Sequence, residues 1–326
     1  MIRIATLVTL FYLLMAQQTD CDKTERKIMS KSAQDYIAAF RRGEDFSPPA
    51  VGVFINGQPD ESAVQVLGKE LAVADPNIRE NIVILLVDMG RRNDPLTAKG
   101  ADVLRHQPII ALLAGAGLAK PDLGREAAMD ALRKLVTQPD LARFDSAFTN
   151  ALAEEPTEEA FLLVAKAKSR KAKDLVDRLA KLPKWQTSES AKIARAALGA
   201  TDVEDEFLAS LEAAKDGESL AQAVGPLALI GTPRSLKAIA ERLRTPLTIE
   251  IPGHMPGKHE KSARLNVLDG LLYNFPDQPV LYPNNVNRDE DYRAAERFCT
   301  ERLGVTYKNP PPPFMKYSTS PAPIMQ

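Results

Sequence analysis

The chain has 326 residues, enough to bury a large hydrophobic core in one domain or two. Its hydrophobic share of 44% and charged share of 26% are ordinary for a globular protein, and the low aromatic share of 6% favours packed helices over a β-sandwich. The formal net charge of -1 excludes an argument from overall charge for binding to nucleic acid or to an anionic membrane.

Residues 1–16 have the pattern of an export signal peptide. Arg3 is the only positive charge, residues 4–15 form a short apolar run, and Ala16 supplies a small residue at its end. The run is shorter than the ~20 residues that a transmembrane helix needs. We therefore expect cleavage near Ala16 and export, to the periplasm. The alternative is an uncleaved membrane anchor.

The chain contains two cysteines, Cys21 and Cys299. In an oxidising compartment they could form a disulfide that ties the N-terminal segment to the last helix. We slightly favour the alternative, in which Cys21 is exposed and Cys299 is a buried small residue, because Cys21 lies in a polar segment. Lipid attachment at Cys21 is disfavoured, since the preceding Gln-Thr-Asp does not resemble a lipobox.

Residues 17–60 are predicted to form an N-terminal arm with one short helix, at about 32–42, and a connector. The apolar face of that helix consists of Tyr36, Ile37 and Phe40. Residues 51–55 alternate in the manner of a strand, but we expect no partner strand after them. The connector is therefore predicted to be an extended segment that covers the first helices.

The stretch from Asp75 to Gly90 has the clearest helical pattern in the chain. Asp75 can cap a helix, and Pro76 fits the first helical position because no amide is needed there. One broad apolar face follows at helical spacing, made of Ile78, Ile82, Leu85, Leu86 and Met89. Gly90 is expected to end the helix in the left-handed conformation. This helix must be buried against neighbours.

The same stretch resembles the HEAT-repeat family, in which each repeat is a pair of antiparallel helices. The similarity lies in an Asp at the turn between helices, the Ile78-Arg79 pair that opens the second helix, and a Leu-rich end with Gly. Residues 121–132 repeat the pattern with Gly124 inserted before the Arg, and residues 230–243 are a third version without the Asp. The resemblance covers residues 60–304. It implies an all-α fold, an α-α superhelix or solenoid with irregular termini.

The helical pattern is nearly continuous from Glu61 to Arg244. First helices of repeats are predicted to begin at a spacing of 30 and 29 residues, which is typical of solenoid repeats, near Glu158, Ser188 and Gly217. The matching second helices are predicted to begin near Arg170, Val203 and Pro233. We therefore assign residues 61–308 to one HEAT-like helical repeat domain.

The C-terminal part of the chain differs in composition from the helical region before it. Residues 245–259 are rich in Pro and Gly and predict a long loop in which helix is excluded. Two further helices are expected at about 265–272 and 290–303. Residues 309–326, with four consecutive prolines near their start, predict an extended or disordered tail.

No motif indicates a catalytic residue, a metal site or a cofactor, and we predict none of the three. His254 and His259 share a loop, but their spacing fits no zinc pattern, so we interpret them as exposed loop histidines; the alternative is a weak metal or substrate contact. His106, at a helix end, is interpreted as structural. Residues 115–120 lack the final Gly and the Lys-Ser/Thr ending of a phosphate-binding loop.

The strongest local charge lies in residues 166–184, with eight basic residues against two Asp. The candidate residues of a basic binding stripe are Lys166, Arg170, Lys173, Lys181 and Lys184. Such a stripe could contact phosphate groups or acidic peptides. We favour the alternative of a solvated helix face, because no aromatic residues interleave with the basic ones. Trp185, at the edge, is expected to pack between helices.

These observations lead to a hypothesis about function. Each two-helix unit of a repeat array buries its apolar face only against its neighbours, so the stack forms a curved ribbon with a long concave face. By analogy with the family, we expect an exported, non-enzymatic scaffold that binds a partner protein or peptide on this face. Two alternatives stay open: a polyanion or nucleic-acid binder using the basic stripe, and a HEAT-like lyase or other enzyme using the His254–His259 loop. Nucleic acid is not the expected partner, and the sequence carries no signal for an oligomeric state.

Overall fold

The computed structural model describes residues 32–44, 54–55, 58–91, 103–251, 259–277, 279, 289–312 and 318–319. Within these residues the protein is mostly helical, as the sequence predicts. The helices of the first half are α2 (Ala33–Arg41), α3 (Glu61–Val73), α4 (Pro76–Arg91), α6 (Gln107–Leu112), the π-helix η2 (Leu113–Gly117), α7 (Leu123–Leu135), α8 (Gln138–Leu141), the 3-10 helix η3 (Ala142–Phe144), α9 (Asp145–Glu154) and α10 (Glu158–Ala167).

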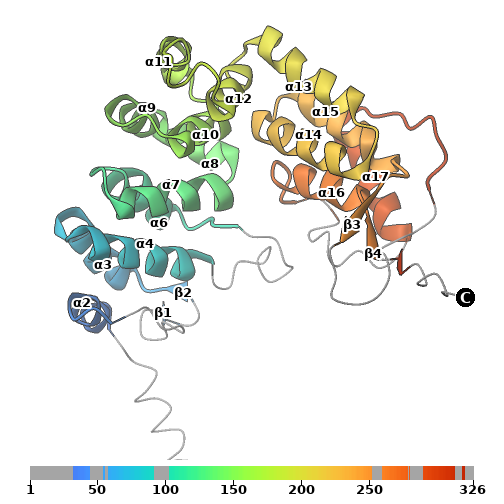
Figure 1. The fold of residues 1–326 in the computed structure, drawn as a ribbon. Coiled ribbons are helices and arrows are strands. Elements are labelled where there is room, and N and C mark those ends of the chain that lie inside the picture. Colours follow the sequence, from blue (N-terminus) through green and yellow to red (C-terminus); the bar gives the residue numbers. More distant parts are fainter. Residues whose placement is uncertain are drawn as a thin grey trace, which may run out of the picture.

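The second half continues the helical pattern up to residue 303. Its helices are the 3-10 helix η4 (Arg170–Ala172), α11 (Lys173–Leu179), α12 (Glu189–Ala197), α13 (Thr201–Ala213), α14 (Gly217–Ile230), α15 (Pro233–Glu241), the 3-10 helix η5 (Arg242–Arg244), α16 (Arg264–Leu272) and α17 (Asp289–Leu303). Together the helices form an arch, in which α2 to α11 make one limb and α13 to α17 the other (Figure 1).

The helices of the arch lie in two rows. In the inner row, which lines the inner side of the arch in Figure 1, each helix packs on the next in the order α4, α7, α10, α12, α14 and α16. Each inner helix also packs on a partner in the outer row, in the pairs α3–α4, η2–α7, α9–α10, α11–α12, α13–α14 and α15–α16. Buried apolar side chains from both rows form one continuous core that runs from Ala33 to Val305.

The predicted helix starts in the middle of the chain are confirmed, but their assignment to repeats is shifted by one helix. Helices α10 and α14 begin at Glu158 and Gly217, and Ser188 caps α12 with its side chain. These three helices lie in the same row as α4 and α7. The resemblance to HEAT repeats predicts that α4 and α7 are the second helices of their repeats, whereas it predicts that these three are first helices. The third version of the motif falls on α15, in the outer row. Periodicity sets where a helix begins, whereas the packing of its apolar face decides its row.

One buried arginine holds three turns of the first limb together. The Arg79 side chain is fully buried, and its Nε donates to the Asp122 Oδ2 at 2.7 Å. Its Nη2 donates to the carbonyl oxygens of Ala116 at 3.1 Å and Gly117 at 3.0 Å, and its Nη1 donates to that of Leu71. The guanidinium therefore ties the start of α4 to the carbonyl ends of α3 and η2.

Gly90 does not end α4, which corrects the sequence prediction. It lies inside the helix with ordinary helical geometry and is buried, and α4 continues to Arg91. A Cβ at this position would clash with the Leu104 side chain and lie 3.3 Å from Ile109 Cδ1. The residue is therefore small because α6 and the segment before it approach closely, and no left-handed backbone is required.

The N-terminal helix belongs to the helical body. Ser32 and Asp35 form a capping box at the start of α2, as expected near residue 32. Tyr36, Ile37 and Phe40 are buried in the common core, and α2 packs on α3 and α4. The predicted boundary at residue 60 is thus not a boundary of the hydrophobic core.

Short strands correct two further expectations. Gln58–Pro59 (β2) pairs antiparallel with Phe54–Ile55 (β1), although we expected no partner strand. The sequence between them, Asn-Gly, is the typical dipeptide of a two-residue hairpin, but we had assigned it to the extended connector.

The second sheet lies where a long loop and an extended or disordered tail were expected. Thr248–Ile251 (β3) pairs antiparallel with His259–Ser262 (β4), and Ser318–Thr319 (β5) pairs with the other edge of β4. The alternating β-branched run Thr-Ile-Glu-Ile is a strand signal. The partner β5 lies far away in the sequence, so only the fold brings it there. The described part of the fold is mostly helical, in agreement with the predicted all-α class, and carries two small sheets.

Candidate functional site

A pocket lies between the two limbs of the arch, where the C-terminal ends of α7 and α16 meet α10. We call it the α7–α16 pocket. It has a volume of about 180 Å³. It is lined by Val103, Lys134, Leu135, Val136, Thr137, Gln138, Lys166, Asp269, Leu272, Tyr273, Asn274 and Pro276. Apolar walls and a few polar groups are typical of ligand sites.

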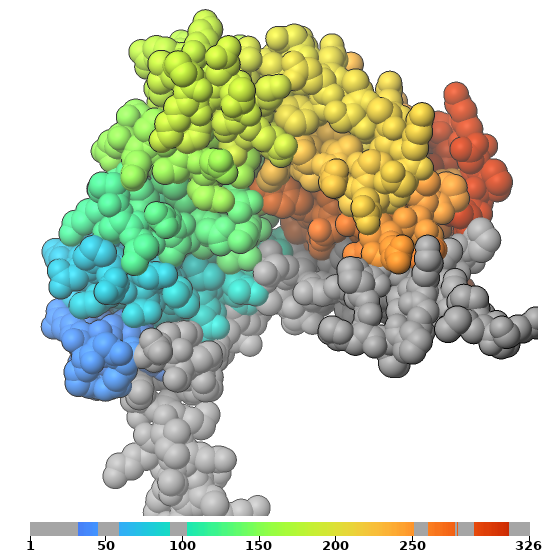
Figure 2. Space-filling model, in the orientation of Figure 1, coloured from blue at the N-terminus to red at the C-terminus, as the bar shows by residue number. Residues whose placement is uncertain are grey.

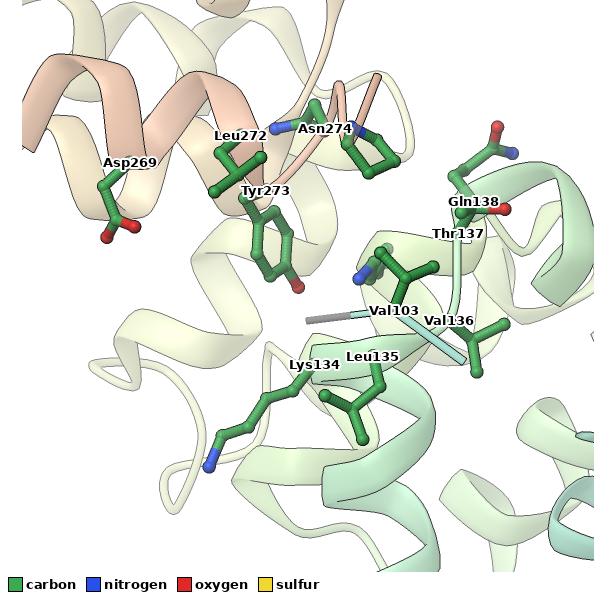
Figure 3. Close-up of a pocket in the computed structure, with 12 residues that line it drawn as sticks. Val103, Lys134, Leu135, Val136, Thr137, Gln138, Asp269, Leu272, Tyr273 and Asn274 are labelled. Atoms are coloured by element: carbon green, nitrogen blue, oxygen red, sulfur yellow. The ribbon is translucent and has the colours of Figure 1, made fainter. Parts of the chain in front are cut away.

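Tyr273 reaches across the pocket from the second limb. Its hydroxyl donates to the Arg133 carbonyl oxygen at 3.3 Å, across 140 positions of the chain. Figure 3 shows the ring projecting from the end of α16 with its hydroxyl directed toward Val103 and Leu135, while Lys134 extends away from it. Burial raises the pKa of the Tyr273 hydroxyl above its ordinary value, so the phenol stays protonated at neutral pH.

Lys166 supplies a buried amine beside this phenol. Its side chain comes from the last turn of α10, and only 7% of the residue is exposed. The Nζ donates to the same Arg133 carbonyl oxygen and lies 4.2 Å from the centre of the Tyr273 ring. Burial, followed by repulsion from the Arg133 guanidinium, lowers the pKa of Lys166 to about 7. The amine therefore changes its charge near neutral pH.

This shift predicts how stability depends on pH. Between the folded pKa of about 7 and the ordinary lysine value of ~10.4, the unfolded chain binds one more proton at Lys166 than the folded chain does. The free energy of unfolding therefore rises with pH in that window, by about 1.4 kcal/mol per pH unit at most. Lys166→Met cannot titrate. In urea denaturation at pH 7, 8 and 9, the free energy of unfolding of the wild type should therefore rise relative to that of this variant at each step. Parallel pH curves would contradict the prediction.

A second pocket adjoins the first along the inner row. It lies between α4 and α7, has a volume of about 430 Å³ and shares Lys134 and Leu135 with the α7–α16 pocket. Its walls are mostly apolar and include Ile84, which is 41% exposed. Asp88 and Arg91 on α4 and Asp130 on α7 supply charges of both signs. We refer to the two adjoining pockets as the inner groove.

The structure does not bring the five residues of the predicted basic stripe onto one surface. Lys166 is buried in the α7–α16 pocket, because it lies on the inward face of α10. Arg170 and Lys173 line a different hollow, beside the end of α12. Lys181 and Lys184 are exposed in the turns after α11, where the Lys184 Nζ lies 4.7 Å from the centre of the Trp185 ring. Lys166 is thus removed from the stripe, and the other four residues are exposed.

Trp185 packs between helices, as predicted. It is buried, and its ring lies 5.0 Å from that of Phe161 on α10. A tryptophan in this position contributes to the core and is not free to stack on a ligand.

The predicted cysteine and histidine sites fall partly outside the described residues. Cys299 is a buried thiol on α17, as one of the two alternatives predicted, and burial raises its pKa to about 11. Cys21 lies outside the described residues, so the disulfide stays a prediction. His254 and the side chain of His259 lie outside them too. His106 is half-buried at the start of α6, and burial lowers its pKa.

Within the described part of the chain, no group of three His, Cys, Asp or Glu side chains is placed to hold a metal ion. Every helix described there is too short or too polar to cross a bilayer. The chain matches no protein-family model, no curated protein and no solved structure. The inner groove therefore has to be interpreted from its own chemistry. Sequence analysis missed it because its two pockets join residues from α4, α7, α10 and α16.

Proposed function

We propose that the protein is an exported, HEAT-like α-solenoid that binds an extended segment of a partner protein along its inner groove. The continuous inner row supports the solenoid interpretation, since each helix of that row packs on the next one along the arch. The observation that carries the binding proposal is the inner groove, in which two pockets adjoin along α4 and α7.

The chemistry of the groove favours a peptide. An apolar floor with an exposed Ile84 can accept apolar side chains, and Asp88, Arg91 and Asp130 place charges of both signs beside it. The helices α4 and α7 that line the groove belong to the inner row, on the side of the arch that faces the hollow between its two limbs (Figure 2). An occupant there could contact several helices at once. The export proposal rests on the pattern of residues 1–16, which lie outside the described residues. N-terminal sequencing of the secreted chain tests it.

The binding proposal predicts a large effect of one charge in the groove. In Ile84→Asp the new carboxylate lies on the apolar floor, so we expect at least a ~10-fold loss of the retained partner, about 1.4 kcal/mol. The measurement is affinity purification of tagged full-length protein from its host, followed by quantitative mass spectrometry of what is retained.

Leu182→Asp is the matched control. Leu182 is an exposed apolar residue like Ile84, at 48% against 41%, but it lies in the turn after α11 and outside the inner groove. A protein retained by wild type and Leu182→Asp but lost from Ile84→Asp supports the proposal. Equal retention by both variants, or recovery of nucleic acid that depends on Arg170 and Lys173, would contradict it.

A further inference from the structure

The amine of Lys166 has surroundings that differ from those of the exposed lysines. Its Nζ contacts the Arg133 carbonyl oxygen and the Tyr273 ring, and no carboxylate among the described residues forms an ion pair with it. Lys134, in the same pocket, is exposed and pairs with Asp130 at 2.8 Å. A buried lysine without a carboxylate loses hydration that no opposite charge replaces.

These surroundings make the amine a nucleophile. The groups facing Lys166 are the Arg133 guanidinium and carbonyl from α7 and the phenol of Tyr273 from the segment after α16. Desolvation and the neighbouring cation both disfavour the ammonium form, so a large fraction of Lys166 is neutral at pH 7. A neutral amine with a free lone pair attacks electrophilic carbon, which an ammonium cannot do.

Tyr273 places a proton donor next to this amine. Its hydroxyl and the Lys166 Nζ bind the same carbonyl oxygen, so the two groups lie side by side at the pocket wall. Because burial keeps the phenol protonated, it can donate a hydrogen bond or a proton to an oxygen that enters the pocket. Val103, Leu135 and Leu272 supply apolar walls for a hydrocarbon substituent.

We propose that the α7–α16 pocket takes a small carbonyl compound, an aldehyde or a ketone, and that Lys166 holds it covalently as an imine. The nitrogen lone pair forms the C–N bond, and the electron pair of the C=O bond moves to oxygen, which takes a proton from the Tyr273 hydroxyl. One amine hydrogen passes as a proton to the Tyr273 phenolate and restores the phenol. The other leaves with the hydroxyl group as water, so the C=N bond remains and the step needs no oxidant or reductant. The site goes beyond the scaffold function and does not depend on it.

Reductive trapping tests the site on unmodified full-length protein. Propanal is added with sodium cyanoborohydride, which reduces an imine to a stable secondary amine, and labelled peptides are quantified by mass spectrometry. At pH 7 an ordinary exposed lysine is neutral in only about one molecule in a thousand. We therefore expect Lys166 to be labelled at least ~10-fold faster than Lys134. Between pH 7 and pH 9 the ratio of the Lys166 rate to the Lys134 rate should fall, because the neutral fraction of Lys166 saturates above its own pKa while that of Lys134 keeps increasing.

Two variants separate the roles of the neighbouring groups. Tyr273→Phe keeps the ring over Lys166 but removes the hydroxyl, and we expect labelling of Lys166 to slow by at least ~10-fold. Lys237→Arg, exposed on α15 and outside both pockets, should leave it unchanged. Labelling of Lys134 with none at Lys166, or a Lys166 rate that follows pH like an exposed lysine, would overturn the proposal. An unchanged rate in Tyr273→Phe would overturn the role of the hydroxyl. Neither readout depends on partner binding.

Discussion

Arg79→Ala should lower the free energy of unfolding by about 3–5 kcal/mol, the largest effect that we expect from a single substitution in this chain. The guanidinium is fully buried and binds the Asp122 carboxylate and carbonyl oxygens of three residues. Its removal leaves a carboxylate that is 9% exposed and several carbonyl groups without their donor. Urea denaturation followed by circular dichroism measures the loss.

Arg234→Ala is the matched control for Arg79→Ala. Arg234 also pairs with an aspartate, Asp205, at 2.5 Å, but both side chains are more than half exposed. Water and salt screen such a pair, so we expect a change of about 0.2–1 kcal/mol. Similar losses in the two variants would show that burial of Arg79 is not what makes its network stabilising.

Gly217→Ala should destabilise the second limb by about 1–3 kcal/mol, because the methyl group has no room. A Cβ on Gly217, at the first position of α14, would overlap the Thr248 carbonyl oxygen and lie 2.7 Å from Ile249 Cγ1. The obstacle is the backbone of β3, which cannot rotate away as a side chain can. Either β3 or the start of α14 must shift. Hydrogen exchange of the β3 and β4 amides, together with urea denaturation, measures the effect.

Gly115→Ala, in the helical turn η2, provides the opposite case. Gly115 is exposed, and a Cβ there would meet nothing within 4 Å. Alanine is a better helix former than glycine, so this variant should gain about 0.5–1 kcal/mol. If both substitutions destabilise equally, the close contact between Gly217 and β3 is not responsible for the loss.

The two proposals concern different parts of one groove. Ile84 lies in the α4–α7 pocket, whereas Lys166 and Tyr273 lie at the α7–α16 pocket. Partner retention and imine trapping can therefore succeed or fail independently. Lys134 and Leu135 line both pockets, so a peptide along the groove and a carbonyl compound on Lys166 would meet at these residues. Once both kinds of binding have been observed, competition between the peptide and the carbonyl compound tests directly whether the two sites adjoin.

Local sequence was sufficient to predict where most helices begin. Thr157 and Ser188 accept hydrogen bonds from backbone amides of the helices that follow, and the apolar residues after each cap recur at helical spacing. Caps and periodicity involve residues three or four positions apart, so they can be read without the fold. The buried face of α4 was predicted in the same way and is confirmed at Ile82, Leu85, Leu86 and Met89.

Only the tertiary structure decided features that depend on distant contacts. Gly90 has the sequence pattern of a helix end, but Leu104 requires it to be small, and β5 exists because residues 318–319 meet β4. Lys166 belonged to a basic run in the sequence, yet its place on the inward face of α10 makes it a buried amine beside Tyr273. A charge pattern predicts exposure because charged groups favour water. Packing of α10 against α7 and the end of α16 overrides that preference at Lys166 and creates the pocket.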